Sequence, residues 1–151
     1  MVLATSVKGM ILVGLDNSLR LHTKDPIDFP KEIVDYIDSL PVDLRSPFPY
    51  EYELCYWRKC WNIRREVGHA LHAQDMEYVA KTWLTVEDVK NIWYAIDQLN
   101  SKRAWESGES IWAWSEIKDH LNRDLLMLEW LISFMRQHGE NEYMVEFYDS
   151  Y

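Results

Sequence analysis

The chain has 151 residues, of which 48% are hydrophobic, and a formal net charge of −9. This length and apolar content predict one globular domain, residues 1–151, built around a single core. Because the charge repels phosphate backbones and anionic membranes, the composition argues against direct binding of duplex nucleic acid and against membrane association. An acidic chain of this kind suits docking on a basic partner, but a charge that only keeps the protein soluble is the simpler interpretation.

The first residues, MVLATSVKGMILVGL, place Lys8 inside a short apolar run. This pattern does not predict a secretory signal, and no run in the sequence approaches the roughly 18 apolar residues of a membrane span. The sequence also has only two cysteines. Together these features predict a cytoplasmic protein.

The N-terminal third of the chain predicts a hairpin followed by a short helix. Two β-forming runs flank Asp16 and Asn17, residues that tolerate turns, so residues 8–23 are predicted to form a β-hairpin. The prolines of DPIDFP, residues 25–30, predict a loop. The apolar residues of KEIVDYIDSL, residues 31–40, have helical spacing between two prolines and predict an amphipathic helix.

Three longer helices are predicted in the rest of the chain. Residues 51–74 contain no proline and show a helical pattern. Thr85 and Asp88 have the spacing of a capping box and predict a helix over residues 85–104. A final helix is predicted over residues 110–138 from its regular apolar positions.

The tail EYMVEFYDSY, residues 142–151, is rich in β-forming residues and alternates weakly. It is therefore predicted to pair with the N-terminal hairpin and to bring the two ends of the chain together. The predicted fold class is α+β: a mostly helical domain with three to four main helices and a small antiparallel sheet, formed by the N-terminal hairpin and the C-terminal strand.

The segment CYWRKCWNIRREVGHALH, residues 55–72, predicts a polar stripe. On a helix that turns about 100° per residue, five polar side chains fall on one side, namely Arg58, Asn62, Arg65, His69 and His72. Trp57 and Trp61 fall at the border with the apolar side, where an indole can bury its ring and still reach a polar partner. The predicted binding residues are therefore Trp57, Arg58, Trp61, Asn62, Arg65 and His69.

These side chains suit more than one ligand. Guanidinium groups present donors that fit phosphate or carboxylate, and a neighbouring indole can stack on a base. A nucleotide, a phosphorylated ligand or an acidic partner surface would fit this combination. Alternatively, Arg58 and Arg65 pair with the chain's own surplus carboxylates and have a structural role.

The cysteines and histidines of the same segment allow further interpretations. On a helix, Cys55 and Cys60 would lie about 140° apart, so they are predicted to be half-buried thiols rather than a disulfide or a shared metal site. His69, His72 and Asp75 only partly suit three metal ligands on one helix. Surface or interface histidines are the simpler interpretation, and no metal site or cofactor is predicted.

No GxSxG, P-loop, HExxH, CxxC or dinucleotide-binding motif occurs in the sequence. The enzyme classes that these motifs mark therefore lose support, and no catalytic residue is predicted. A protein that binds without catalysing a reaction is the expectation that follows.

Three short pieces carry a resemblance: GLDN at 14–17, ELCYWRKCWNIR at 53–64 and FYDSY at 147–151. They resemble a family of small phage- and prophage-encoded proteins of unknown function, which pair a GLD start with a central YWRK segment and an aromatic tail. The resemblance transfers no catalytic residue. It implies a role in phage–host conflict or in takeover of the host cell, and a location in the host cytoplasm.

Three functional hypotheses follow. The leading one is a non-enzymatic, phage-type binding protein that occupies a host macromolecule, with a host protein as partner, for example as an inhibitor of a defence component such as a CRISPR effector. The alternative is a protein that binds or sequesters a nucleotide or phosphate through Arg58 and Arg65. The third is a metal-dependent hydrolase that uses His69, His72 and Asp75.

Overall fold

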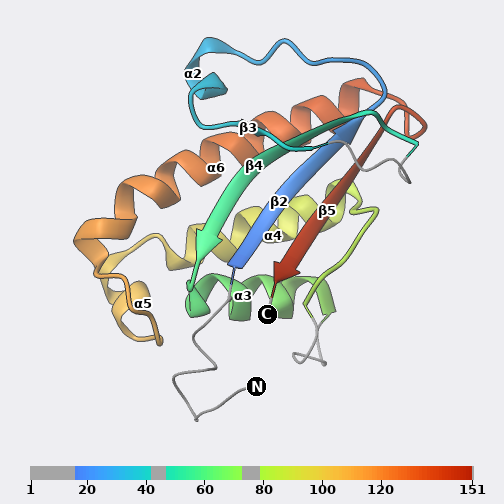
Figure 1. Ribbon diagram of the computed structural model, residues 1–151. Coiled ribbons are helices and arrows are strands. Elements are labelled where there is room, and N and C mark those ends of the chain that lie inside the picture. The colour runs from blue at the N-terminus through green and yellow to red at the C-terminus, as the bar shows by residue number, and fades with distance from the viewer. Residues whose placement is uncertain (1–15, 42–46, 73–78, 151) are drawn as a thin grey trace.

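The computed structural model describes residues 16–41, 47–72 and 79–150 (Figure 1). In chain order the elements are β2 (Asp16–Thr23), α2 (Lys31–Val34), β3 (Asp38–Ser39), β4 (Tyr50–Arg58), α3 (Trp61–His72), α4 (Val86–Leu99), α5 (Lys102–Glu106), α6 (Trp114–Gln137) and β5 (Tyr143–Ser150). None of the helices in these ranges has the length and hydropathy of a transmembrane segment.

The strands form one four-stranded antiparallel sheet in the order β3-β4-β2-β5. β2 lies in the middle and pairs along its whole length with β4 on one side and with the C-terminal strand β5 on the other. The predicted α+β class is confirmed, and so is the predicted pairing of the tail with an N-terminal strand. Asp16 lies opposite Ser150, so the first and last described residues are neighbours.

The helices cover one side of the sheet. Figure 1 shows α4 and α6 behind the strands and α3 across their lower ends, whereas no helix of the described residues crosses the side that faces the viewer. The core lies between these layers: Leu19, Leu21, Val145 and Phe147 project from the strands and are at most 1% exposed. Ile92, Ile96, Leu121 and Leu128 of α4 and α6 meet them and are fully buried.

The capping box of α4 is confirmed. The backbone N–H of Asp88 donates to Oγ1 of Thr85 at 3.1 Å, and the N–H of Thr85 donates to Oδ2 of Asp88 at 3.0 Å. The helix ends at Leu99, earlier than predicted, because Ser101 caps the separate short helix α5. The last long helix, α6, begins at Trp114 and ends one residue before the predicted limit.

The predicted helix over residues 51–74 is wrong in its first half. Residues 50–58 form the strand β4, and Trp61–His72 are helical, while residues 73 and 74 lie outside the described residues. Between them Lys59 has a φ of 53°, a left-handed conformation that neither a strand nor a helix continues. A bulge in β4 also makes Leu54 and Cys55 both buried, which breaks the alternation that marks a strand.

Two smaller predictions in the N-terminal third are also corrected. Asp16 and Asn17 form no turn, because both belong to β2, and residues 8–15 of the predicted hairpin lie outside the described residues. The predicted helix over 31–40 is reduced to α2, four residues long, and β3 follows at Asp38. The prolines of DPIDFP do lie in a loop, as predicted.

The outer edge of β4 is covered in two different ways. Its first half pairs with β3, where Asp38 lies opposite Glu53. In its second half the backbone carbonyl oxygens bond to side chains: Nε2 of His120 lies 3.0 Å from the oxygen of Tyr56, and Nε1 of Trp112 donates to that of Arg58 at 2.7 Å. The connection from α5 to α6 and the start of α6 therefore close this edge.

Candidate functional site

The single polar stripe predicted for residues 58–72 does not exist, because a strand and a helix share these residues. Trp57 and Arg58 belong to β4, whereas the other predicted binding residues, Trp61, Asn62, Arg65 and His69, belong to α3. The alignment of Arg58 with the polar residues of α3 assumed one continuous helix, which does not form. The structure leaves two surfaces to consider, one on α3 and one on the sheet.

Two of the predicted binding residues lie in the interior. Trp57 is 1% exposed, and its Nε1 donates to Oδ2 of Asp124 on α6 at 2.6 Å. Asn62 is fully buried, and its Nδ2 donates to the carbonyl oxygen of Trp105 at 2.9 Å. These bonds join β4 to α6 and α3 to α5, so the geometry gives both residues a structural role.

Three of the predicted residues do come together on α3. Trp61, Arg65 and His69 line a hollow of about 360 Å³, together with Arg64 of the same helix and Glu109 of the loop before α6. We call this the α3 hollow. Trp61, Arg65 and His69 share one side of the helix because they follow each other at intervals of four residues.

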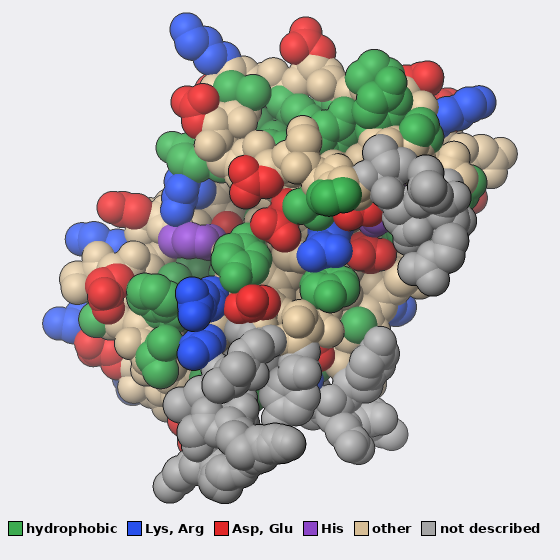
Figure 2. All heavy atoms as spheres, in the orientation of Figure 1, with side chains coloured by type: hydrophobic (Ala, Val, Ile, Leu, Met, Phe, Trp, Pro, Cys, Tyr) green, Lys and Arg blue, Asp and Glu red, His purple; other side chains and the backbone are tan. Residues whose placement is uncertain are grey.

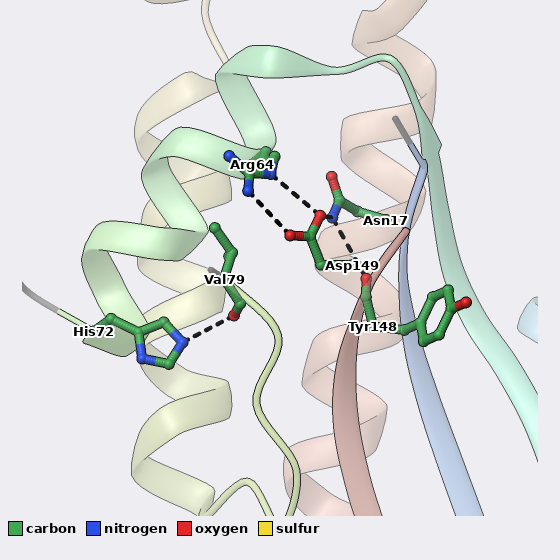
Figure 3. Close-up of polar contacts among 6 residues, drawn as sticks. All are labelled: Asn17, Arg64, His72, Val79, Tyr148 and Asp149. Carbon is green, nitrogen blue, oxygen red and sulfur yellow. Dashed lines mark hydrogen bonds and ion pairs between the residues drawn. The ribbon is translucent and has the colours of Figure 1, made fainter. Parts of the chain in front are cut away.

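Arg64 joins the wall of the α3 hollow to the last strand (Figure 3). Its Nε and Nη2 atoms lie 3.1 Å and 3.0 Å from the two carboxylate oxygens of Asp149, and both side chains are almost completely buried. Nδ2 of Asn17 donates to Oδ1 of the same carboxylate at 2.6 Å. The cluster connects α3, β5 and β2 and holds one wall of the hollow in place.

The charges around the α3 hollow are largely balanced. Asp149 compensates Arg64, Glu66 lies 3.0 Å from Nε of Arg65, and Glu109 adds a further negative charge. A strongly cationic pocket for a free phosphate is therefore absent from this surface. An uncharged or zwitterionic ligand with a ring to stack on Trp61 suits these side chains better than a highly charged anion does.

The second surface is the side of the sheet without helices. Alternate residues of the three long strands point to it, and we call it the polar face; it comprises Asp16, Ser18, Arg20, His22, Glu51, Glu53, Tyr56, Arg58, Glu146 and Tyr148. Figure 2 looks onto this side and shows acidic, basic and hydrophobic side chains intermingled on it. Four carboxylates against two arginines make the polar face acidic.

Arg20 is the centre of the polar face. Its guanidinium lies 3.8 Å from the centroid of the Tyr148 ring, its Nε donates to Oγ of Ser18 at 2.9 Å, and its Nη2 lies 3.8 Å from Glu53. Cation–π contacts of this kind fix an aromatic ring at a surface. Tyr148 is thus held in one orientation although it is 39% exposed.

Tyr56 lies on the other side of β2 from Tyr148, since both are opposite Ser18 in the sheet. It is 42% exposed, and burial of its hydroxyl, followed by the charge of the Asp16 carboxylate and a hydrogen bond to it, raises its pKa. Burial also raises the pKa of Glu53, although Arg20 partly opposes this effect. The polar face therefore displays two tyrosines, each beside a carboxylate or a guanidinium.

His22 lies deeper in the same face, between two glutamates. Its Nδ1 is 3.1 Å from Oε2 of Glu51 and its Nε2 is 3.6 Å from Oε2 of Glu146, but neither contact has hydrogen-bond geometry. The ring is 4% exposed, so it is not available to a ligand from solvent. Its place between Glu51 of β4 and Glu146 of β5 puts the ring where the three long strands meet.

Cys55, His120 and Asp124 combine residue types that occur in thiol enzymes, but their environment opposes that chemistry. Burial raises the pKa of Cys55 well above its usual value, and the charge of Asp124 and a hydrogen bond to it raise it further. A nucleophilic cysteine needs the opposite shift. Moreover, Nδ1 of His120 lies 2.8 Å from Asp124 and its Nε2 contacts the Tyr56 carbonyl, so neither nitrogen can take a proton from the thiol.

The metal hypothesis gains no support from the described part of the chain. No group of three histidine, cysteine or acidic side chains there is placed to hold a metal ion. Nε2 of His72 lies 2.9 Å from the carbonyl oxygen of Val79 (Figure 3), which engages that nitrogen. Asp75, the third predicted ligand, lies outside the described residues. Cys55 and Cys60 are both free, as predicted, and they are buried rather than half-buried.

Comparison with known proteins provides no family and no relative for this chain. No protein-family model matches it, and neither the curated proteins nor the solved structures contain a match. The assignment of function therefore rests on the geometry of the two surfaces.

Sequence reasoning missed most of the polar face. Arg20 and Glu146 lie in no motif, and Tyr148 lies in the FYDSY segment, to which no binding role is assigned. Tyr56 falls in a predicted helix that does not form. The signal that was available is the alternation of the tail, in which Tyr143, Val145 and Phe147 are buried and Glu146 and Tyr148 point outwards. Once the tail is accepted as a strand, its even-numbered residues define one edge of the surface.

Proposed function

We propose that this chain is a non-enzymatic binding protein whose polar face docks on a basic surface of a protein partner. The observation that carries the proposal is the polar face, which no helix in the described ranges covers and where Tyr56 and Tyr148 are exposed among Asp16, Glu53 and Glu146. Tyrosines that are held in place are typical anchors of protein interfaces, since they bury much area at little entropic cost.

The charge of the polar face supports a basic partner. Its carboxylates outnumber its arginines, and the whole chain has a net charge of −9. Complementary charge accelerates encounter and excludes acidic partners. In the phage context that the sequence resemblance implies, the partner is a host protein, and a nucleic-acid-binding component of a defence system has the required positive surface.

The described residues of the polar face and of the α3 hollow include no activated nucleophile, which also favours binding over catalysis. Both cysteines have raised pKa values, and for Cys60 burial followed by the Asp124 charge raises the value to about 12. His120 engages both of its ring nitrogens. Among the described residues we therefore find no activated nucleophile at either surface.

A capture experiment with matched variants tests the proposal. The immobilised wild-type chain, a Tyr56→Ala/Tyr148→Ala variant and a Tyr94→Ala variant are incubated with bacterial host lysate. Tyr94 is 56% exposed but lies on α4, away from the polar face. The wild type and Tyr94→Ala should retain the same basic protein, and the double variant should lose it by about thirtyfold in affinity. Equal retention by all three would refute the role of the polar face.

A second candidate function is suggested by the α3 hollow. Its lining includes three of the binding residues predicted from sequence, namely Trp61, Arg65 and His69. This combination favours a small ligand with an aromatic ring. Native mass spectrometry of the purified chain, followed by titration with an uncharged nucleoside, tests this. Arg65→Ala should weaken binding and Arg58→Ala should not, because Arg58 lies on β4 outside the hollow.

A further inference from the structure

A hollow of about 400 Å³ lies beside β5, at the edge of the sheet opposite β3. Its lining includes Trp83, Thr85, Glu140, Asn141 and Tyr143. It shares no residue with the α3 hollow. We call it the Trp83 hollow, and its volume falls in the range of sites that bind small groups.

Trp83 has a backbone conformation that its side chain disfavours. Its φ is 55°, in the left-handed region that large residues rarely adopt. Hydrogen bonds on either side impose this conformation, because Lys81 exchanges two backbone bonds with Phe147 and the N–H of Leu84 donates to Val145. Residues 81–84 thus follow the edge of β5 with a kink at Trp83, and glycine is the residue usually found at such a kink.

The indole of Trp83 is displayed rather than buried. The residue is 56% exposed, and its ring centroid lies 5.9 Å from that of Phe48 in an edge-to-face contact. This contact orients the ring and leaves more than half of the residue in solvent. The local backbone therefore does not favour a tryptophan at this position. Residues held in a disfavoured backbone conformation cluster at functional sites, so Trp83 indicates that the hollow binds a group.

A carboxylate shares the Trp83 hollow with the indole. Glu140 lines the same hollow, and Asn141 and Thr85 add polar atoms. Tyr143 also lines the hollow, and its pKa is raised first by burial and then by the negative charge of Glu140. The nearby cation Lys81 is paired with Asp88 at 3.4 Å, and the Thr85–Asp88 capping box occupies the first turn of α4. An anion is therefore disfavoured in this hollow and a cation is favoured.

We propose that the Trp83 hollow binds an arginine side chain of a protein partner, with the guanidinium stacked on the exposed indole and paired with the Glu140 carboxylate. A planar guanidinium is the cation best suited to lie on an indole face, and its donors match a carboxylate beside it. The proposal goes beyond the function assigned to the polar face and does not rest on it.

Nuclear magnetic resonance of the full chain with a short probe peptide tests the proposal. The probe is acetyl-Gly-Arg-Gly-amide, and the matched control replaces arginine with citrulline, which keeps the shape and removes the charge. The indole N–H signal of Trp83 is assigned by its loss in Trp83→Phe. At millimolar peptide we expect this signal to shift with the arginine peptide and not with the citrulline peptide.

Two substitutions identify the groups responsible. Glu140→Gln keeps the indole and the backbone and should weaken binding of the arginine peptide about tenfold. Glu106→Gln removes an exposed carboxylate from α5, on the other side of the molecule (Figure 1), and should change nothing. Trp83→Gly should abolish binding, which is read here from the signals of the arginine peptide because the indole is absent. The variant should keep a cooperative thermal transition, because glycine suits the left-handed backbone.

The proposal is overturned if the arginine and citrulline peptides shift the Trp83 indole equally, if neither shifts it, or if Glu140→Gln binds as the wild type does. Glu140→Gln decides the question even if Trp83→Gly fails to fold. A Tyr56→Ala/Tyr148→Ala variant should bind the peptide normally, so failure here and failure of the polar face are distinguishable.

Discussion

Arg64 of α3 and Asp149 of β5 form a buried ion pair in which two guanidinium nitrogens meet two carboxylate oxygens, at 3.1 Å and 3.0 Å. Asn17 of β2 donates to the same carboxylate. One carboxylate near the end of the chain therefore joins the first long helix to the two strands at its side (Figure 3). This arrangement leads to the first prediction.

Arg64→Met should destabilise the fold by about 3 kcal/mol or more, because it leaves Asp149 buried without its cation. Urea unfolding followed by circular dichroism measures the loss. Arg65→Met is the matched control on the same helix: its ion pair with Glu66 is exposed, so the free energy of unfolding should change by about 0.5 kcal/mol or less. Equal losses in the two variants would contradict the structural role of the buried pair.

The contact of His120 with both Asp124 and the Tyr56 carbonyl predicts a pH dependence of stability. Burial alone would lower the pKa of His120, but the hydrogen bond and charge of Asp124, with the carbonyl contact, raise it above 6.5 overall. The protonated ring therefore stabilises the fold fully below the unfolded-state pKa, and this contribution is lost as pH rises through the folded-state pKa.

Unfolding free energies of the wild type and His120→Gln between pH 5.5 and 8.5 check this prediction. The wild type should be the more stable protein at the acidic end, and the difference should shrink with rising pH. A difference that is constant with pH, or that grows towards alkaline pH, would show that the neutral ring makes these contacts.

Phe147→Ala and Tyr148→Ala test the alternation of β5. Phe147 is 1% exposed and packs near Trp57 at 6.1 Å between ring centroids, so its loss should cost about 3 to 5 kcal/mol. Tyr148 points to the polar face, where removing its contact with Arg20 should cost about 1 kcal/mol or less. Thermal denaturation of both variants measures the contrast, and comparable losses would mean that the register of the tail is different.

The cysteines should resist alkylation in the folded protein. Burial raises the pKa of Cys55 well above its usual value and, with the Asp124 charge, that of Cys60 to about 12, so little thiolate exists at pH 8. Mass spectrometry after iodoacetamide treatment should show no added group in buffer and two in denaturant. Rapid labelling of Cys55 in buffer would instead support thiol chemistry.

The parts of the fold that could be predicted from sequence are those with strong local signals. The capping box at Thr85 and Asp88 fixed the start of α4, and the regular apolar positions of α6 identified that helix to within a few residues. The tail was recognised from its alternation and its β-forming residues, and the sheet confirms its pairing. In each of these segments local preference and tertiary packing agree.

The errors arose where tertiary contacts override local preference. Asp16 and Asn17 favour a turn in isolation, yet Asn17 is held in β2 by its bond to Asp149, a residue far away in sequence. In β4 the bulge at Leu54 removes the alternation of buried and exposed residues. The strand ends at Lys59, which has a left-handed backbone conformation that a lysine in the sequence does not indicate. The polar face could not be predicted because it requires the register of three strands.

The side chains that bond to the outer edge of β4 affect how the protein associates with other chains at high concentration. A strand with unpaired backbone groups is a template on which further chains can add, and such growth leads to fibres. His120 and Trp112 occupy the Tyr56 and Arg58 carbonyl oxygens that an incoming strand would need. On this side the sheet is therefore terminated by an imidazole and an indole, and polymerisation from it would first have to displace both.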